Sequence, residues 1–323
     1  MNIPNSNRAD YSAIALPDRL LDLSVPADCA GLRLDQALAR MLPEHSRSRL
    51  AAWVKDGRVR IEGAAADPKR KVWGGERITV AEEPAHAERA QQAEDIPLDI
   101  LHEDESILVI NKPAGLVVHP GSGNWQGTML NALLHHAPQL AAVPRAGIVH
   151  RLDKDTSGLL VVAMTLAAQT DLVRQLQART VKRHYLALVH GHVARDGTVD
   201  APIGRHPVQR TKMAVVSGGR ASRTHYHVIE RFASATLLEC ALETGRTHQI
   251  RVHMASIGHP LAGDPVYGPR KAGAALLADF PRQALHAWRL ALVHPVTRQE
   301  MGWEAPLPQD FSRLLAALRG TKE

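Results

Sequence analysis

Charged side chains are concentrated in one short stretch of the chain, residues 147–163, between two apolar runs. The stretch reads GIVHRLDKDTSGLLVVA and holds four charged residues within five positions: Arg151, Asp153, Lys154 and Asp155. A carboxylate beside a guanidinium can serve as a nucleophile or as a general acid and base. Charged residues before a Thr-Ser-Gly turn also form ordinary solvated loops, so this stretch alone leaves both interpretations open.

Two later segments contain an aromatic residue and two arginines of interest. Residues 182–191, KRHYLALVHG, include Tyr185, and residues 242–268, LETGRTHQIRVHMASIGHPLAGDPVYG, include Arg246 and Arg251. Taken singly, Tyr185 in an apolar strand is typical of a core residue, and a lone arginine is typical of a helix surface. The three segments become informative only together.

Several common cofactor motifs are absent from the sequence. It contains no GxxxxGK[ST] phosphate loop, no GxGxxG after a strand, no HExxH and no GxSxG. The two cysteines, Cys29 and Cys240, have no CxxC partner, and the adjacent His135 and His136 diverge on a helix. We therefore expect neither a metal site nor a bound nucleotide.

In chain order, HRLDKDTSG, KRHYLAL and GRTHQIRVH resemble the signature motifs of the RluA family of pseudouridine synthases. NKPAGLVVHPG, residues 111–121, resembles the opening motif of this family, and the resemblance runs from residue 97 to residue 308. It implies an enzyme that isomerises uridine within RNA by breaking the N1–C1′ bond, turning the base and rejoining it through C5. This reaction needs no redox change and no energy input, so the resemblance implies no cofactor.

The resemblance also implies a role for individual residues. Asp153 corresponds to the catalytic aspartate, and Arg251 to the arginine that pairs with it and keeps it ionised. Tyr185 corresponds to the active-site tyrosine, whose ring can stack on uracil and whose hydroxyl can move a proton. Arg151 corresponds to the arginine that fills the space left by a flipped base, and Arg246 is a weaker candidate for contacting phosphate.

The sequence leaves open which carboxylate reacts and by which route. Asp155 follows Asp153 by two residues, and spacing alone gives no reason to prefer either, whereas the HRLD match favours Asp153. Asp153 can attack the base, attack C1′ as a nucleophile, or remove a sugar proton to begin an elimination. All three routes remain as alternatives.

A basic N-terminal segment contains the elements expected to deliver RNA to this site. Between residues 31 and 80 there are eleven Lys or Arg residues against six acids. Apolar spacing predicts a helix that stops at Pro43 and a second that begins after Ser46 and ends at Gly57, before a short strand. The basic residues of the second helix and the following turn are Arg47, Arg49, Lys55 and Arg58. This pattern resembles the S4 RNA-binding domain; an amphipathic hairpin with a solvated face is the alternative.

The rest of the chain is predicted to form an α+β catalytic domain with a mixed, largely antiparallel sheet and a central cleft. The KPAG turn is expected to join strands at residues 107–110 and 116–118. A second basic segment, residues 205–231, includes Arg210 and Lys212 and is expected to extend the RNA track. We assign the chain to a flexible tail (1–17), an S4-like domain (18–82), a linker of low apolar content (83–96), the catalytic domain (97–318) and a tail (319–323).

Composition limits the partners and the compartment. The 323 residues carry a net charge of +6 with a pI near 9.5, which favours a polyanionic partner. Apolar runs are too short to span a bilayer, so we expect no membrane partner. Two isolated cysteines suit a reducing compartment, and we expect a cytoplasmic protein that acts as a monomer.

The likeness extends to one branch of the family. With an S4-like domain in front and the loop APIGRHPVQRTKMAV at residues 201–215, the chain most resembles the enzymes that modify large-subunit ribosomal RNA. This implies three uridines of the helix 69 stem-loop as targets. The alternatives are a family member acting on other ribosomal or transfer RNA uridines, a noncatalytic RNA-binding assembly factor, and an N-glycoside hydrolase that releases the base.

Overall fold

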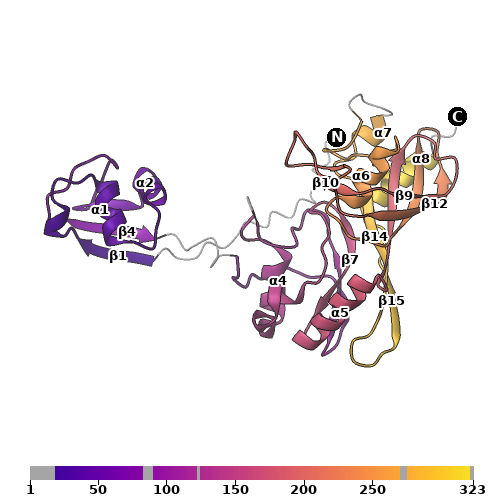
Figure 1. Cartoon of the computed structure of the whole chain (residues 1–323), viewed down its shortest axis with the longest axis horizontal. Coiled ribbons are helices and arrows are strands. Elements are labelled where there is room, and N and C mark those ends of the chain that lie inside the picture. Colours follow the sequence, from indigo (N-terminus) through magenta and orange to yellow (C-terminus); the bar gives the residue numbers. More distant parts are fainter. Residues whose placement is uncertain (1–18, 83–89, 122–123, 270–274, 321–323) are drawn as a thin grey trace, which may run out of the picture. The chain divides into compact units, whose positions relative to one another are not determined.

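The chain divides into two compact units, which Figure 1 shows as a computed structural model. The structure describes residues 19–82, 90–121, 124–269 and 275–320. One unit lies within Ile14–Arg89, and the other contains Ala90–Glu323. Over the described ranges, no helix is both long enough and apolar enough to cross a bilayer.

The N-terminal unit has four antiparallel strands, ordered β1-β4-β2-β3, and two α-helices, as the S4 resemblance predicts. The hydroxyl of Ser46 accepts a hydrogen bond from the backbone N–H of Arg49 and so begins α2. Gly57 has a φ of 73°, which suits the residue just after a helix. The elements are β1 (Arg19–Ser24), α1 (Leu34–Met41), α2 (Arg47–Lys55), β2 (Val59–Ile61), β3 (Ala64–Ala65) and β4 (Arg77–Glu82).

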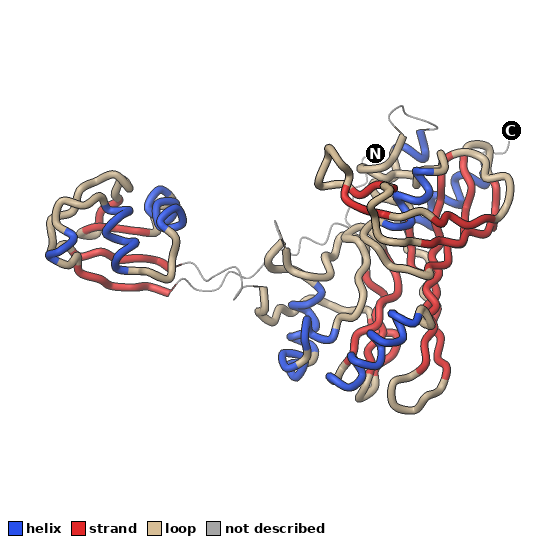
Figure 2. Tube along the Cα trace, in the orientation of Figure 1, coloured by secondary structure: helices blue, strands red, loops and turns tan. Residues whose placement is uncertain are grey.

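The C-terminal unit is built on a large sheet (Figure 2) with the order β5-β6-β7-β14-β8-β13-β12-β9, in which β15 also pairs with β14. In the described part of the chain its neighbours are antiparallel, apart from the parallel pair β7 and β14. The predicted α+β architecture is therefore confirmed. The strands are β5 (Ile100–Glu103), β6 (Ile107–Lys112), β7 (Ser157–Ala163), β8 (Lys182–His190), β9 (Gly197–Asp200), β12 (Arg223–Arg231), β13 (Ala235–Leu242), β14 (Leu285–Val293) and β15 (Glu300–Glu304), with β10 (Ile203–Arg205) and β11 (Met213–Val215) forming a separate hairpin.

Helices cover both faces of this sheet, so its central strands are apolar on both sides. Side chains alternate between the faces: Leu160 of β7 packs in the core shared with α4 and α6, and Leu159 in the core shared with α5. All seven residues of β7 are buried. A strand buried on both faces reads as a continuous apolar run, which explains the segment after the charged stretch. The helices are α4 (Met129–His136), α5 (Leu166–Ala178), α6 (Gln249–Ser256), α7 (Ala275–Ala278) and α8 (Gln309–Gly320).

Ser157 and Gly158, the first residues of β7, hold the C-terminal end of the charged loop in place. Gly158 has a φ of 110°, and a Cβ at this position would lie 2.2 Å from the carbonyl oxygen of Ala287 on β14. Only glycine tolerates both the conformation and the close approach. The buried hydroxyl of Ser157 also hydrogen bonds with Nδ1 of His286 at 3.0 Å. The Thr-Ser-Gly turn therefore anchors the loop that carries Asp153.

Two stretches differ from the predicted secondary structure and boundaries. Residues 90–96 fall in the predicted linker, yet the Glu94 carboxylate accepts a hydrogen bond from the backbone N–H of Gly127 at 2.9 Å, and Ile96 is buried in the core. One apolar side chain and a few polar contacts hold this segment, which its low apolar content does not reveal. Residues 116–118 form an isolated bridge from Val117 to Thr128 instead of a strand.

Candidate active site

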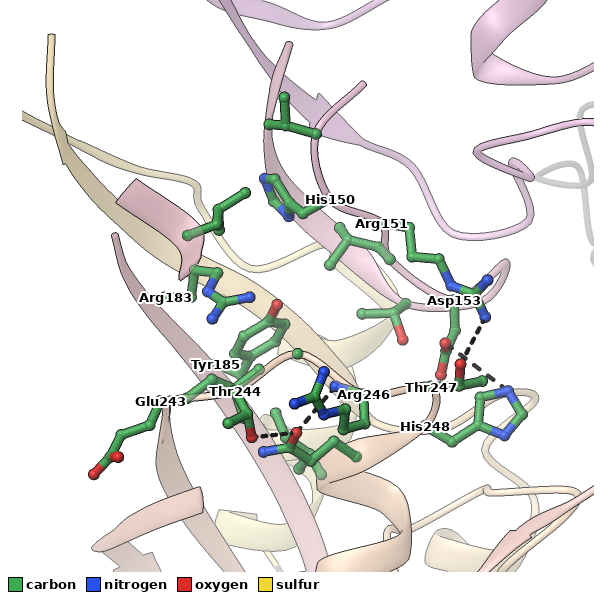
Figure 3. Close-up of a pocket in the computed structure, with 18 of the residues that line it drawn as sticks. His150, Arg151, Asp153, Arg183, Tyr185, Glu243, Thr244, Arg246, Thr247 and His248 are labelled. Carbon is green, nitrogen blue, oxygen red and sulfur yellow. Dashed lines mark hydrogen bonds and ion pairs between the residues drawn. The ribbon is translucent and has the colours of Figure 1, made fainter. Parts of the chain in front are cut away.

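Three of the sequence motifs meet in the wall of a pocket of about 750 Å³ in the C-terminal unit (Figure 3). The wall combines the loop before β7, the end of α5, the start of β8, the end of β13 and the loop that leads into α6. Its charged residues are seven arginines and two carboxylates, namely Arg145, Arg151, Arg179, Arg183, Arg220, Arg246 and Arg251 with Asp153 and Glu243. The pocket therefore carries a positive field that suits a polyanion.

Asp153, Arg251 and Asp264 form a row of three hydrogen-bonded charged side chains, with Asp153 at the pocket end. Its Oδ2 accepts a hydrogen bond of 2.9 Å from Nη1 of Arg251 on α6. Nε and Nη2 of the same guanidinium bind the two carboxylate oxygens of Asp264 at 2.7 and 2.9 Å. This two-point grip fixes the plane of the Arg251 guanidinium, and through it the position of the Asp153 carboxylate.

Arg251 and Asp264, behind Asp153, form a buried ion pair in which each charge stabilises the other. The side chains of Arg251 and Asp264 are 5% and 0% exposed, whereas that of Asp153 is 16% exposed at the pocket wall. Burial alone would lower the pKa of Arg251, but hydrogen bonds and charges from Asp264 and Asp153 raise it. Burial likewise acts to raise the pKa of Asp264, yet Arg251 holds it below its usual value. The result is an accessible carboxylate beside a guanidinium that stays charged.

Tyr185 reaches the same pocket from β8. Its side chain is nearly buried and packs in the core on that face of the sheet. Burial raises the pKa of the Tyr185 hydroxyl, an effect that Arg183 opposes and Asp153 reinforces. The phenol is therefore neutral at physiological pH, and its ring forms a flat apolar surface on the wall that holds Asp153.

Two further residues lie on the Asp153 side of the pocket (Figure 3). Arg151 is exposed, and its Nη2 donates to the hydroxyl of Thr247 at 3.2 Å. Nε2 of His248 lies 3.9 Å from Oδ1 of Asp153, and its Nδ1 hydrogen bonds with the Tyr267 hydroxyl at 2.9 Å. Burial lowers the pKa of His248 although Asp153 opposes the shift, so the ring is mostly neutral at pH 7.

Asp155, the alternative carboxylate, does not line the pocket. The structure describes every residue of the loop before β7, in which Asp155 lies. Its backbone carbonyl accepts a hydrogen bond of 3.1 Å from Nη1 of the buried Arg282. The geometry thus favours Asp153 over Asp155 as the reactive group.

Lys112 ties the loop that carries Asp153 to the KPAG turn. It is fully buried, and its Nζ donates to the carbonyls of Pro113, Leu116 and Lys154 at 2.7, 2.9 and 2.9 Å. Burial lowers the pKa of Lys112 to about 7, although the aspartates of the loop oppose the shift. The three carbonyls match the three N–H donors of an ammonium group, so this lysine acts as an internal clamp.

Replacing Lys112 with methionine is expected to lower the free energy of unfolding by about 2–4 kcal/mol, because three carbonyls lose their donor. Since the pKa of Lys112 in the fold lies below its ordinary value of 10.5, the unfolded chain binds more protons between the two values. The wild-type protein should therefore gain stability relative to Lys112→Met as the pH rises from about 7 to about 10.5. Urea unfolding at several pH values measures both effects.

The matched control for Lys112→Met is Lys154→Met, because the Lys154 side chain is exposed in the same loop and only its carbonyl is used. We expect this control to unfold like the wild-type protein. Equal stability of Lys112→Met and wild type would show that the clamp contributes nothing.

The structure places the predicted RNA-binding residues of the C-terminal unit in two locations. Arg151 and Arg246 line the pocket. Arg210 and Lys212 lie outside its wall, in the loop between β10 and β11. Arg210 is exposed, whereas Nζ of Lys212 donates to the carbonyl of Val266 at 3.1 Å.

In the N-terminal unit, two of the predicted RNA-binding residues already have protein partners. Nη2 and Nε of Arg47 bind the buried Asp35 at 2.9 and 3.0 Å. The Arg49 guanidinium lies 5.0 Å from the ring centre of Trp53. A guanidinium has five N–H donors, so the two hydrogen bonds of Arg47 leave other donors for phosphate. Of the other two predicted residues of this unit, Lys55 is exposed, and Arg58, which also interacts within the protein, is half-buried.

One group with the composition of a metal site occurs among the described residues, and it lies in the N-terminal unit. Glu44, His45 and Glu82 bring one potential ligand atom each to within 4.8 Å of one another. Nε2 of His45 already hydrogen bonds with Glu82 at 2.9 Å. An ordinary histidine–carboxylate pair accounts for these contacts.

Three buried charged residues of the site, Asp264, Lys112 and Arg183, were not among the predicted functional residues. Each stands within one of the family-like motifs, GDPVYG, NKPAG or KRHY, and each is adjacent to apolar or turn residues. The presence of a charged residue inside such a motif was the only indication in the sequence that these residues belong to the site. Asp264 pairs with Arg251 and Lys112 binds backbone carbonyls, whereas Arg183 forms no ion pair among the described residues, so residue spacing could not predict the burial of these three charges.

Comparisons with known proteins agree with this site. The sequence profile of the RNA pseudouridylate synthases matches residues 106–256, and that of the S4 domain matches residues 32–78. Curated relatives are 51% to 62% identical over 93% or more of this chain. The chain therefore belongs to the RluA family of RNA pseudouridine synthases, which are isomerases, and the resemblance seen in its motifs is confirmed.

Several of these relatives carry one name, ribosomal large subunit pseudouridine synthase D. The chain is 62% identical to that of Nitrosomonas europaea, over 94% of this chain and 89% of the relative. It is 57% identical to that of Pseudomonas aeruginosa, over 93% of this chain and 96% of the relative. Among solved structures, human RNA pseudouridylate synthase domain containing 4 superposes with a TM-score of 0.54 at 29% identity, covering 68% of this chain and 92% of that one.

Proposed function

We propose that this enzyme converts uridine to pseudouridine in large-subunit ribosomal RNA, with the uridines of the helix 69 stem-loop as targets. The observation that carries the proposal is the partly exposed Asp153 carboxylate, held by the buried Arg251 in a basic pocket. The S4 domain and the shared name of the relatives support a ribosomal target. The proposal includes a monomer in the cytoplasm, where the buried thiols of Cys29 and Cys240 stay reduced.

In this mechanism Asp153 starts the reaction by one of the three routes named above, each of which leads to cleavage of the glycosidic bond. Cleavage of N1–C1′ frees the uracil, which turns and bonds to C1′ through C5. The C5 proton is then released and N1 gains a proton, so the atoms balance without a co-reactant. Tyr185 stacks on the freed base, and its hydroxyl relays the C5 proton. Arg251 orients the Asp153 carboxylate through their 2.9 Å hydrogen bond.

The target uridine must leave its stack to reach Asp153. Extrusion of a base costs a few kcal/mol, which protein contacts must offset. Arg151 suits this task because it is exposed and held by one hydrogen bond to Thr247, so it can move into the vacated space. Arg220 and Arg246 of the pocket wall, together with the basic residues of α2, supply contacts to the RNA backbone.

Pseudouridine mapping in cells that lack this protein tests the proposed target. We expect large-subunit RNA to lose pseudouridine at helix 69, and wild-type protein but not Asp153→Asn to restore it. Loss at transfer RNA or small-subunit positions would replace the proposed target with another. An unchanged pattern would favour a noncatalytic assembly factor and contradict the proposal.

Removal of residues 1–89 is expected to weaken RNA binding by about 10-fold or more, because the basic α2 surface is lost. Each lost phosphate contact should reduce the slope of log K against log salt by about 0.7 to 0.9. The truncated enzyme should still modify a short RNA at high concentration, since the pocket lies within the remaining unit. Binding titrations across salt concentrations measure the slope; an unchanged slope would remove the N-terminal unit from the RNA interface.

A further inference from the structure

Arg183 is a buried arginine in the pocket wall, and none of the described residues provides its guanidinium with a counter-ion. It lies on β8, two residues before Tyr185, and is 8% exposed. In the described part of the chain, its buried Nε has no hydrogen-bond partner, and the side chain forms no ion pair. Figure 3 shows Arg183 and Tyr185 extending from the same strand into the pocket. A buried charge of this kind is costly unless a partner arrives.

The carboxylates of the pocket are already committed to other cations. Asp153 is bound by Arg251 at 2.9 Å. Glu243 is bound by Arg179 at 3.1 Å, and it also contacts Arg223 and His225 at 3.4 and 2.7 Å. The wall thus holds a positive charge that these carboxylates do not neutralise.

The surroundings of Arg183 also favour an anion over a second cation. A Cβ added to Gly245 would lie 2.7 Å from Nη1 of Arg183, so the guanidinium packs against the loop that leads into α6. Gln249, Ile250 and Arg251, the first turn of α6, line the same pocket, and no side chain caps this helix. The first turn of a helix carries a partial positive charge.

We propose that Arg183 binds a phosphate group of the RNA strand beside the uridine being modified. The proposal deepens the function proposed above and rests on it for the identity of the RNA. A guanidinium fork matches two phosphate oxygens and gains a full opposite charge, whereas a uracil carbonyl would leave the charge uncompensated. The absence of a protein counter-ion at Arg183 then has a reason: the substrate brings it.

Thermal unfolding in the presence of inorganic phosphate tests the site without RNA. Full-length wild type, Arg183→Met and Arg179→Gln are each compared in sodium phosphate and in sodium chloride of equal ionic strength. Wild type is expected to gain about 2–4 °C more from phosphate than Arg183→Met does, as for a ligand near ten times its dissociation constant. Arg179→Gln is the matched control, because it removes a pocket arginine already paired with Glu243, and it should keep the phosphate effect.

Two outcomes of the unfolding experiment would overturn the proposal. One is an equal phosphate effect in wild type and Arg183→Met. The other is a melting temperature in chloride that falls by several degrees in Arg183→Met, because this would show that the guanidinium stabilises the free protein. Unchanged or increased stability in chloride is the expected result, since the variant removes an uncompensated buried charge.

Steady-state kinetics supply the second readout, on an RNA that the wild-type enzyme modifies. Loss of a charged hydrogen bond to phosphate should raise KM by about 10- to 100-fold in Arg183→Met, with a smaller change in kcat. Arg183→Lys should recover part of this loss, because it keeps the charge but not the fork. A defect confined to kcat would overturn the proposal. A wrong ribosomal target leaves the phosphate result unaffected, so the two proposals fail separately.

Discussion

Replacing Asp153 with asparagine is expected to lower the rate of pseudouridine formation by at least about 10⁴-fold and to leave the fold intact. The amide has nearly the shape of the carboxylate, but it lacks the charge that every one of the three routes requires. Arg251 keeps its two bonds to Asp264, so the wall behind the site should not collapse. Single-turnover rates at saturating enzyme measure the loss, and RNA affinity and melting temperature should stay close to those of wild type.

Asp155→Asn is the matched control for this prediction. Asp155 stands two residues away in the same loop, but it is not part of the pocket wall. We expect its variant to retain near wild-type activity. If Asp155→Asn abolished the reaction and Asp153→Asn spared it, the assignment of the reactive carboxylate would be wrong.

Replacing Arg251 with methionine is expected to cost about 3–5 kcal/mol of stability, because the Asp264 carboxylate would be left buried without its partner. Activity should fall by about 10²-fold or more as well, since Asp153 loses the group that orients it. Urea unfolding and single-turnover kinetics measure the two losses separately. A variant as stable as wild type would contradict the role of this buried pair.

The stability loss in Arg251→Met should depend on pH in a defined direction. In wild type the pKa of Asp264 is lowered, so its contribution is present above the ordinary value of 3.8 and is lost as the pH falls. Without Arg251, burial should raise this pKa, and the charged form would then destabilise the variant at neutral pH. The gap between the two proteins should narrow as the pH is lowered toward 4.

The double variant Arg251→Met/Asp264→Asn separates stability from catalysis. Asparagine can still accept the backbone hydrogen bonds from Val266 and Tyr267, and it carries no charge. We expect the double variant to recover much of the stability of wild type but little of its activity. Recovery of both would show that Arg251 acts only through folding.

Local patterns predicted the helices and the position of the loop well, because they depend on neighbouring residues. Ser46 caps α2 and Gly57 follows it, as their residue types indicate. The position of Asp153 in a turn before a buried strand also follows from the sequence, since Gly158 and the apolar run are local signals. The pairing of Asp153 with Arg251, 98 residues apart, was accessible only through the family motifs.

The buried charges were the least predictable part of the site. Lys112, Arg183 and Asp264 belong to residue types that usually lie on the surface. Backbone carbonyls hold Lys112 and the Arg251 guanidinium holds Asp264, whereas the proposed partner of Arg183 is the RNA. Hydrophobic periodicity carries no information about such contacts. Residues 90–96 belong to the C-terminal unit through the buried Ile96 and a few polar contacts, which the low apolar content of the segment does not reveal.

The release of tritium from RNA labelled at C5 of uridine tests the central claim most directly. Rejoining the base through C5 must expel the hydrogen at that atom, whereas cleavage of the glycosidic bond alone does not. With purified wild-type enzyme and a helix 69 stem-loop, we expect tritium to enter water in step with pseudouridine formation, without free uracil, and Asp153→Asn to release none. Free tritiated uracil, or labelled RNA that stays unchanged with wild type, would contradict the account.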